Sequence, residues 1–368
     1  MVVAGKKLDR VVVGASHTKG VWQANIDSAQ ISGYLTWNEA AGSSQALGKA
    51  NARLTSLIIS PAAATDVTDL LEGKNTTTQI PALDIVADNF ELFGKKFGRL
   101  ELIANNVTTQ GVREWRINKL AIANPDAHLT ATGNWNTRGG ADSMTTLHYK
   151  LDLDDAGGLL DRFGFANVLR NGKGKMSGDV SWKGVPFSLD IPSLTGTIAL
   201  DLGAGQFLKV EPGAAKLLGV LSLQALPQLL KLDFRDVFSE GLAFTGITAT
   251  ALIDRGVART DNLKMRSTSV TVLMDGSADI DKETQNLHVV VIPDVNVGTG
   301  SLVYALAVNP VIGLGTFLAQ LFLREPVMRA LTSQYQITGP WKNPVVTKMA
   351  GPVKLPPKTA EAPASPVK

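Results

Sequence analysis

LHYKLDLD, residues 147–154, decides the fold class because apolar and polar side chains alternate through it without a break. Leu147, Tyr149, Leu151 and Leu153 share one face of an extended chain, and the residues between them are histidine, lysine and aspartate. Successive side chains on a strand point to opposite sides, so a period of two is the pattern of a half-buried β-strand. The stretch therefore predicts a strand with one apolar and one solvated face.

The same alternation recurs along much of the chain. Further examples are Lys175–Lys183, Thr197–Leu202 and Val270–Ile280. Turn sequences such as Asn171-Gly172 separate the runs. Many such strands joined by short turns predict an antiparallel sheet with one wet and one apolar face. The apolar face could be the closed core of an ordinary sandwich or barrel, or it could be an open surface.

Few segments have a helical pattern. Residues 154–163 predict a short helix capped by Asp154 or Asp155. Residues 211–230 predict a longer one, because Pro212 suits the first turn of a helix and Pro227 ends or kinks it. The expected fold class is therefore mainly β, with a few short helices.

Residues 295–323 form an uncharged run near the C-terminus. Asn309-Pro310 divides it, and each apolar piece is shorter than the ~17–25 residues of a membrane-spanning helix. Asn309 is a suitable N-cap, so a helix is predicted from Pro310 to Leu323. A helix this apolar is expected to be buried in protein or to lie on lipid. The side chains expected to make such contacts are Ile312, Phe317, Leu318, Leu321 and Phe322.

The composition divides the chain into three parts. Residues 1–294 are expected to form the sheet with its inserted helices, and residues 295–345 an apolar helical segment followed by a final strand. Residues 346–368 are rich in proline, alanine and lysine, which predicts a disordered tail. The N-terminus has no signal-peptide pattern, and we expect the chain to be a portion of a longer protein.

Composition and motifs argue against catalysis, metal binding and nucleic-acid binding. The absence of cysteine excludes thiolate nucleophiles and cysteine-ligated metals. The four histidines are scattered without metal-ligand spacing, and neither a nucleophile elbow nor a Walker loop is present. A net charge of +3 from interspersed residues is too small for a nucleic-acid surface. We therefore expect no enzymatic activity, no cofactor, no metal and no nucleic-acid partner.

One long block goes beyond pattern. Residues 205–244 read GQFLKVEPGAAKLLGVLSLQALPQLLKLDFRDVFSEGLAF. Together with Gly256–Met265, Met274–Ile280 and Asn309–Pro326, this block resembles the C-terminal region of YhdP-type proteins, large members of the AsmA-like family of Gram-negative bacteria. The likeness runs from about Leu8 to about Met349, which is nearly the whole chain.

The resemblance implies bridge-like lipid transfer. In this family a long curved β-sheet folds into a groove with a hydrophobic inner wall. An N-terminal helix anchors full-length members in the inner membrane, and the groove extends through the periplasm. The implied function is phospholipid transport between the inner and outer membranes, contributing to outer-membrane integrity. This chain lacks the anchor and is much shorter than a full-length member, so we expect a periplasmic C-terminal portion.

The resemblance also assigns roles to the alternating strands. The expected partners are phospholipid, the inner leaflet of the outer membrane at the C-terminal end, and other envelope proteins. The alternative is a non-catalytic scaffold or assembly factor of the envelope, whose apolar faces are closed cores. The residues expected to form the groove wall are Leu147, Tyr149, Leu151, Leu153, Ile198, Leu200, Leu202, Val270, Val272 and Met274.

Overall fold

The structure is a computed structural model that describes most of the chain. The described residues are 2–3, 6–7, 11–40, 48–60, 80–109, 112–137, 143–208, 242–293, 314–324 and 326–349. The predicted helix at residues 211–230 lies outside them, as does Ile312. Of the predicted tail, residues 346–348 belong to the last strand of the sheet, and residues 350–368 lie outside the described part.

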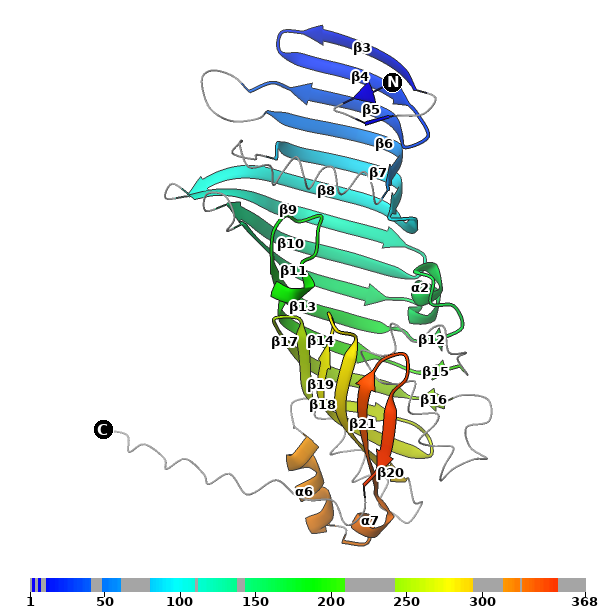
Figure 1. The fold of residues 1–368 in the computed structure, drawn as a ribbon. Coiled ribbons are helices and arrows are strands. Elements are labelled where there is room, and N and C mark those ends of the chain that lie inside the picture. The colour runs from blue at the N-terminus through cyan, green and yellow to red at the C-terminus, as the bar shows by residue number, and fades with distance from the viewer. Residues whose placement is uncertain are drawn as a thin grey trace, which may run out of the picture.

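Among the described residues, seventeen strands form one sheet that extends along the molecule (Figure 1). Apart from the β6–β7 pair, neighbouring strands run antiparallel, and β3 and β22 are the two edges within the described residues. In order, the strands are β3 (Val12–Thr18), β4 (Val21–Asp27), β5 (Ile31–Asn38), β6 (Lys49–Ile59), β7 (Ala82–Leu92), β8 (Lys95–Thr109), β9 (Val112–Asn124), β10 (Ala127–Thr137), β11 (Ser143–Leu153), β13 (Gly174–Lys183), β14 (Thr195–Leu202), β17 (Gly246–Asp254), β18 (Val257–Arg266), β19 (Val270–Asp279), β20 (Thr284–Pro293), β21 (Ser333–Pro340) and β22 (Val345–Lys348).

The pair β6–β7 corrects the prediction of a wholly antiparallel sheet. These strands run parallel, with Ala52 opposite Ile85 and Leu57 opposite Phe90. Parallel neighbours need a crossover of a dozen or more residues, and residues 60–81 supply that length. Alternation of side chains is the same in both directions of pairing, so the sequence pattern did not reveal the crossover.

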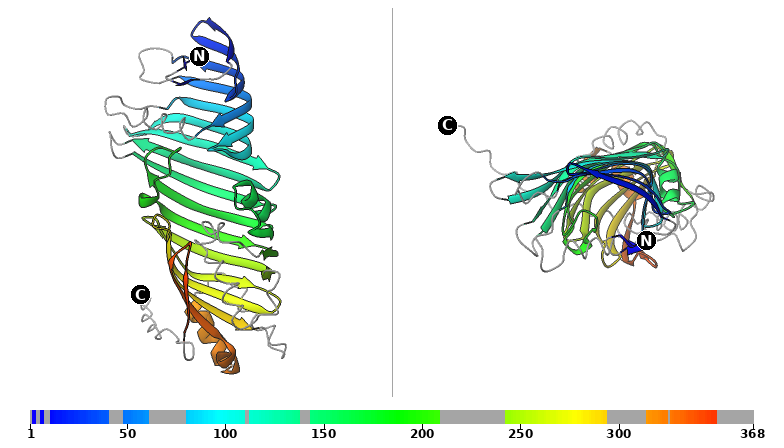
Figure 2. Two further views of the ribbon diagram at one scale, coloured as in Figure 1. Left: turned by 45° about the vertical axis from the view of Figure 1, so that its right-hand side comes forward. Right: turned by 90° about the horizontal axis from the view of Figure 1, so that it is seen from above.

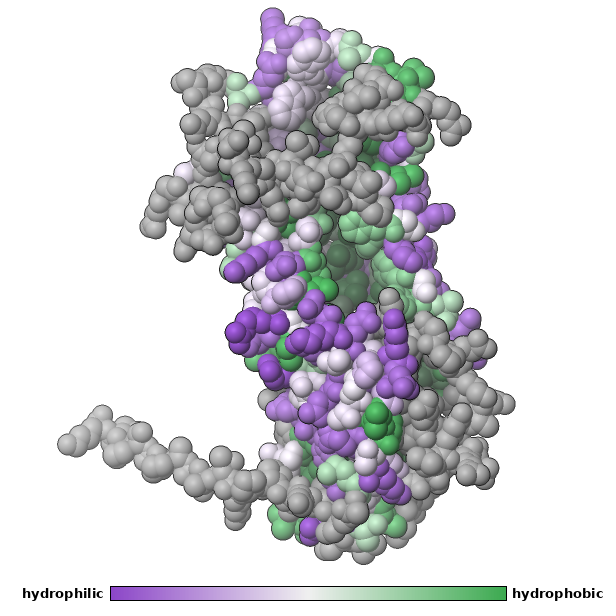
Figure 3. Space-filling model, in the orientation of Figure 1, coloured by the Kyte–Doolittle hydropathy of each residue, from purple (hydrophilic) through white to green (hydrophobic). Residues whose placement is uncertain are grey.

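The sheet curves across its width. Seen along the long axis, the strands form an arch (Figure 2, right). In β11 burial alternates as the sequence predicts: Leu147, Tyr149 and Leu151 are half-buried, whereas His148 and Lys150 are exposed. Figure 3 shows a recess at mid-height of the molecule, where hydrophobic residues are visible between hydrophilic ones. The mainly β, curved architecture with one apolar face is thereby confirmed.

A three-stranded sheet folds over the concave face. Its strands are β12 (Leu169–Asn171), β15 (Gly205–Phe207) and β16 (Leu242–Phe244), which directly precede β13, follow β14 and precede β17. At the first corner Gly172 has a φ of 100°, which a residue with a side chain rarely adopts. Phe207 and Phe244 then pack in the same apolar cluster as Met265 of the main sheet.

The C-terminal end of the concave face is filled. Val272, Val289 and Ile337 have no exposed surface, and Tyr335 is 1% exposed. These residues belong to the cluster that contains Phe207 and Phe244. The concave face is therefore a closed core at β18–β21, in contrast to the half-buried face of β11.

The C-terminal helices pack against the opposite face of the same strands. They are α6 (Leu314–Arg324) and α7 (Pro326–Leu331), at the bottom of Figure 1. Phe317 of α6 is fully buried, and the ammonium of Lys264 lies 5.5 Å from its ring centroid. Burial lowers the pKa of Lys264, and the contact with the ring offsets part of the desolvation. Leu323, in contrast, is 81% exposed.

Two short helical turns and a separate strand pair complete the described elements. Helix α2 (Ala156–Arg162) lies within the range predicted at residues 154–163. Of the two candidate caps, Asp155 serves: its Oδ1 accepts a hydrogen bond from the Gly158 amide at 3.1 Å. The remaining elements are the 3-10 turn η1 (Ile191–Ser193) and the strand pair β1 (Val2–Val3) and β2 (Lys6–Lys7).

Candidate functional site: the concave apolar face

The concave face from β10 to β17 carries a continuous apolar surface, which we call the inner wall. Leu151 lies between Leu129 and Met176 on the neighbouring strands, and Met176 in turn lies opposite Leu200. Side chains directly opposite each other on paired strands are in contact range, so this row crosses the strands without a polar gap. The members of the inner wall are Leu129, Ala131, Leu147, Tyr149, Leu151, Met176, Ile198, Leu200, Ala249 and Ala251.

The ten predicted wall residues fall into three groups. Leu147, Tyr149, Leu151, Ile198 and Leu200 are half-buried members of the inner wall. Leu153 and Leu202 belong to the same strands but are 7% and 6% exposed, because they pack with the folded-over sheet. Val270, Val272 and Met274 lie in the closed core of β18–β21 and are at most 1% exposed.

The predicted contact residues of the C-terminal helix are mostly covered. Phe317, Leu318 and Phe322 are 0%, 2% and 7% exposed, respectively. Ile312 and the side chain of Leu321 lie outside the described part of the chain. Among the described side chains of α6 and α7, the large apolar ones that are exposed are Leu323 and Leu331, at 81% and 44%.

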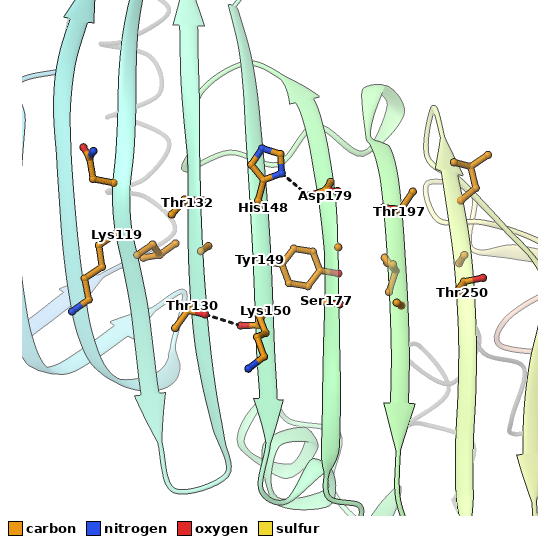
Figure 4. Close-up of a pocket in the computed structure, with 18 residues that line it drawn as sticks. Lys119, Thr130, Thr132, His148, Tyr149, Lys150, Ser177, Asp179, Thr197 and Thr250 are labelled. Carbon is orange, nitrogen blue, oxygen red and sulfur yellow. Dashed lines mark hydrogen bonds and ion pairs between the residues drawn. The ribbon is translucent and has the colours of Figure 1, made fainter. Parts of the chain in front are cut away.

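Tyr149 brings a polar group to the inner wall. Its ring extends towards Gly178 on β13, as Figure 4 illustrates, and its hydroxyl oxygen lies 3.2 Å from the point where a Cβ on Gly178 would stand. Burial raises the pKa of Tyr149, and the negative charge of Asp179 adds to the shift. The phenol therefore stays neutral over the physiological pH range. A side chain at position 178 would come into close contact with its hydroxyl group.

A strap borders one long side of the concave face. Residues 184–190 connect β13 to η1, and Phe187 packs edge-on against Trp115 of β9 at 6.2 Å between ring centroids. Backbone carbonyls hold the strap: Thr145 donates to the Gly184 oxygen at 2.8 Å, and the Trp182 indole donates to the Val185 oxygen at 3.1 Å. Since β10 and β11 lie between β9 and β13, the strap crosses both of them.

Helix α2 borders the opposite long side. Phe163, which ends the helix, lies 5.0 Å from the ring of Phe97 on β8. Arg162 donates from Nε to Oδ2 of Asp126, in the turn between β9 and β10, at 2.7 Å. Leu159 and Leu160 pack against the apolar cluster. Apolar contacts and the hydrogen bond between Arg162 and Asp126 together hold the helix against the sheet.

The face of strands β8 to β17 that is opposite the inner wall is polar and carries ion pairs. Lys119 lies 2.6 Å from Glu101, and its hydrogen bond holds the pKa of that carboxyl below the usual value. A shallow hollow of about 860 Å³ crosses β9–β17, and most of its lining side chains come from outer positions. Figure 4 shows His148 directed at Asp179 and Thr130 bonded to the Lys150 backbone there. This face has the solvated composition that alternation predicts.

Among the described residues, no group of three histidine, cysteine, aspartate or glutamate side chains is placed to hold a metal ion. In the same part of the chain, no helix has both the length and the apolar composition required to span a membrane.

Sequence patterns missed the folded-over sheet and the strap. The strands of the folded-over sheet have three residues each, too few for alternation to be recognised. Phe187 sits in a segment without periodicity, so no sequence pattern distinguished it. Both depend on contacts between strands far apart in the sequence.

Comparison with known proteins agrees with the resemblance of the sequence. Residues 1–346 match the family described as YhdP protein. Over 258 residues the chain is 31% identical to a protein of Escherichia coli (strain K12) named intermembrane phospholipid transporter YhdP. The matched segment is 70% of this chain and 20% of that relative, so the chain spans a minor part of the relative's length. No solved structure matches.

Proposed function

The chain belongs to the YhdP family, and we propose that it conducts phospholipid along the inner wall. The observation that carries the proposal is the apolar row through Leu129, Leu151, Met176 and Leu200, which is unbroken by polar side chains and still partly exposed. Acyl chains need a dry surface and no specific polar partners. Burial contributes about 0.8 kcal/mol per CH₂ group, so such a wall holds a lipid without site chemistry.

The name of the relative supports a proposal for where transport takes place. That protein is named an intermembrane phospholipid transporter. We accordingly propose that this chain acts in the periplasm, between the inner and outer membranes, and supports the integrity of the outer membrane. Because the match covers 20% of the relative, the chain would supply one section of such a path.

Lipid handling of this kind is not enzymatic. The wall offers apolar contact along the path of the acyl chains, and the polar headgroup would remain in water at the mouth of the arch. The strap and α2 would then limit how far a bound lipid can shift sideways. No bond in the lipid has to be made or broken.

The C-terminal helices support a proposed membrane contact. Leu323 and Leu331 present apolar surface to solvent at the end of the molecule (Figure 1). Isolated leucines of this kind can insert at the boundary of headgroups and acyl chains. We propose that this end rests on the inner leaflet of the outer membrane, with envelope proteins as further partners. Phe317 would serve this contact indirectly, by fixing α6 to the sheet.

The second candidate function is a scaffold of the cell envelope. The closed core at β18–β21 favours it, because there the apolar face is already filled and cannot take a lipid. In that case the half-buried inner wall would be the surface for a protein partner. The two functions differ in what the purified chain carries.

Native mass spectrometry after gentle purification distinguishes these functions. We expect the folded chain to retain phospholipid, seen as additional masses that match the lipids extracted from the same sample. Detergent exchange should strip these masses, and incubation with phospholipid vesicles should restore them. A lipid-free mass under both conditions would favour the scaffold.

A further inference from the structure

Three segments meet on the α2 side of the sheet. The turn after β7, the turn after β9 and helix α2 after β11 share this side because alternate strands end there (Figure 1). They enclose a pocket of about 440 Å³ lined by Gly94, Lys96, Asp126, Gly158 and Arg162. We call this cavity the side pocket.

Two lysines have no ion-pair partner among the residues described here: Lys96, which lines the side pocket, and Lys95, which precedes it in β8. Asp126 is neutralised by Arg162, and the Asp155 carboxylate caps α2. Lys95 and Lys96 form no ion pair with any of the described residues. Glu91 lies opposite Lys96 and Asp126 lines the pocket, but neither carboxylate is within ion-pair distance of Lys95 or Lys96 among the described residues, so both ammonium groups are available to an anion from outside the chain.

Lys95 stands where the apolar surface ends. Its Nζ lies 2.7 Å from the point where a Cβ on Gly164 would be, so it extends over the end of α2. Phe163 precedes Gly164 and contacts Phe97, whose ring lies 5.7 Å from that of Phe90. Phe90 is 8% exposed, so the accessible aromatic surface here is that of Phe97 and Phe163, and it ends at the ammonium group of Lys95.

An apolar surface next to an ammonium group matches a phospholipid, whose acyl chains are apolar and whose phosphate is negatively charged. We propose that Lys95 binds the phosphate of a phospholipid whose acyl chains lie along the concave face beside Phe97, and that Lys96 and Arg162 of the side pocket add positive charge nearby. The inference rests on the proposed function and adds a headgroup site to it. Lysine suits this role because it binds phosphate as a compact point charge. Phosphate contacts would hold the headgroup at the α2 side while the chains stay on the wall.

Paired lipids with and without phosphate test the site. Vesicles of phosphatidylcholine carry a trace of either fluorescent phosphatidylglycerol or fluorescent diacylglycerol with the same chains, and the uptake of each by the lipid-free chain is measured. For K95Q/K96Q we expect uptake of phosphatidylglycerol to fall roughly tenfold, which corresponds to about 1.4 kcal/mol. Uptake of diacylglycerol should stay at the wild-type level.

The matched control is K175Q/K183Q. Both lysines are exposed on β13, on the face opposite the inner wall, and the change in net charge is the same. This variant should take up both lipids as the wild type does. Equal phosphatidylglycerol uptake by the wild type and a folded K95Q/K96Q would overturn the headgroup site, as would an equal loss of both lipids. A wild type that takes up neither lipid would instead overturn the proposed function.

Inorganic phosphate distinguishes the source of the anion. Calorimetric titration of the lipid-free chain with phosphate should give weak binding that K95Q/K96Q loses. If that binding is lost while uptake of phosphatidylglycerol is unchanged, the pocket takes free phosphate and the lipid headgroup is excluded. If the wild type takes up phosphatidylglycerol and the double variant does not, the headgroup is the ligand.

Discussion

Leu200→Asp is expected to abolish phospholipid loading while the sheet stays folded. Leu200 lies in the middle of the apolar row, between Met176 and Ala249 on the adjacent strands. It is half-buried, so a carboxylate there keeps contact with water and costs stability of about 1–3 kcal/mol. An acyl chain crossing the same point would have to desolvate the charge, so retained lipid should fall roughly tenfold or more. Native mass spectrometry of the purified variant measures this loss.

Met144→Asp is the matched control for Leu200→Asp. Met144 is an apolar residue on β11 that is 44% exposed, and it lies on the outer face. The substitution removes a side chain of similar size and introduces the same charge, so it should leave lipid retention unchanged. Circular dichroism verifies that both variants keep their sheet content. Wild-type loading in a folded Leu200→Asp variant would mean that lipid does not use this row.

Val272→Asp should instead unfold the C-terminal part of the sheet. Val272 has no exposed surface and lies between Met265 and Val291 in the closed core. An isolated carboxylate at this position has neither water nor a partner, so we expect a loss of roughly 4 kcal/mol or more in the free energy of unfolding. That is a large part of the total of about 5–15 kcal/mol of a typical domain. Denaturant unfolding followed by circular dichroism provides the measurement.

Val272→Ala separates the effect of the charge from that of the cavity. It removes two methyl groups and should cost about 2 kcal/mol, leaving the sheet folded at ambient temperature. If Val272→Asp were as stable as Val272→Ala, water or a lipid would have to reach this position, and the concave face would be open at β19. The sequence pattern, which placed Val272 and Leu200 in one group, does not distinguish these outcomes.

The sequence predicted the strands well because alternation is a local signal. Leu147, Tyr149 and Leu151 share a face in β11 as their spacing requires, and Asp155 caps the short helix that follows. The open or closed state of an apolar face is not a local property. Val272 is covered because β12, β15 and β16 fold back over the sheet, and contacts between segments far apart in the sequence decide that.

Membrane contact of the C-terminal helix illustrates the same limit. Its apolar composition is evident from the sequence, but a helix apolar on most sides gives no indication of which face meets the sheet. In the structure, the face of α6 that carries Phe317 meets the sheet, where the Phe317 ring packs over Lys264 of β18. Leu323 is exposed instead, and the sequence did not distinguish it from its neighbours. A buried lysine on a central strand was likewise unforeseen.

Site-specific photo-crosslinking tests the central claim most directly. A benzophenone amino acid is placed at Tyr149 on the inner wall or at Met144 on the outer face of the same strand, and the chain is irradiated in cells with labelled phospholipid. Lipid conduction along the concave face predicts labelled adducts at position 149 and background labelling at position 144. Equal labelling at both positions, or none at position 149 in a chain that is folded, would contradict it.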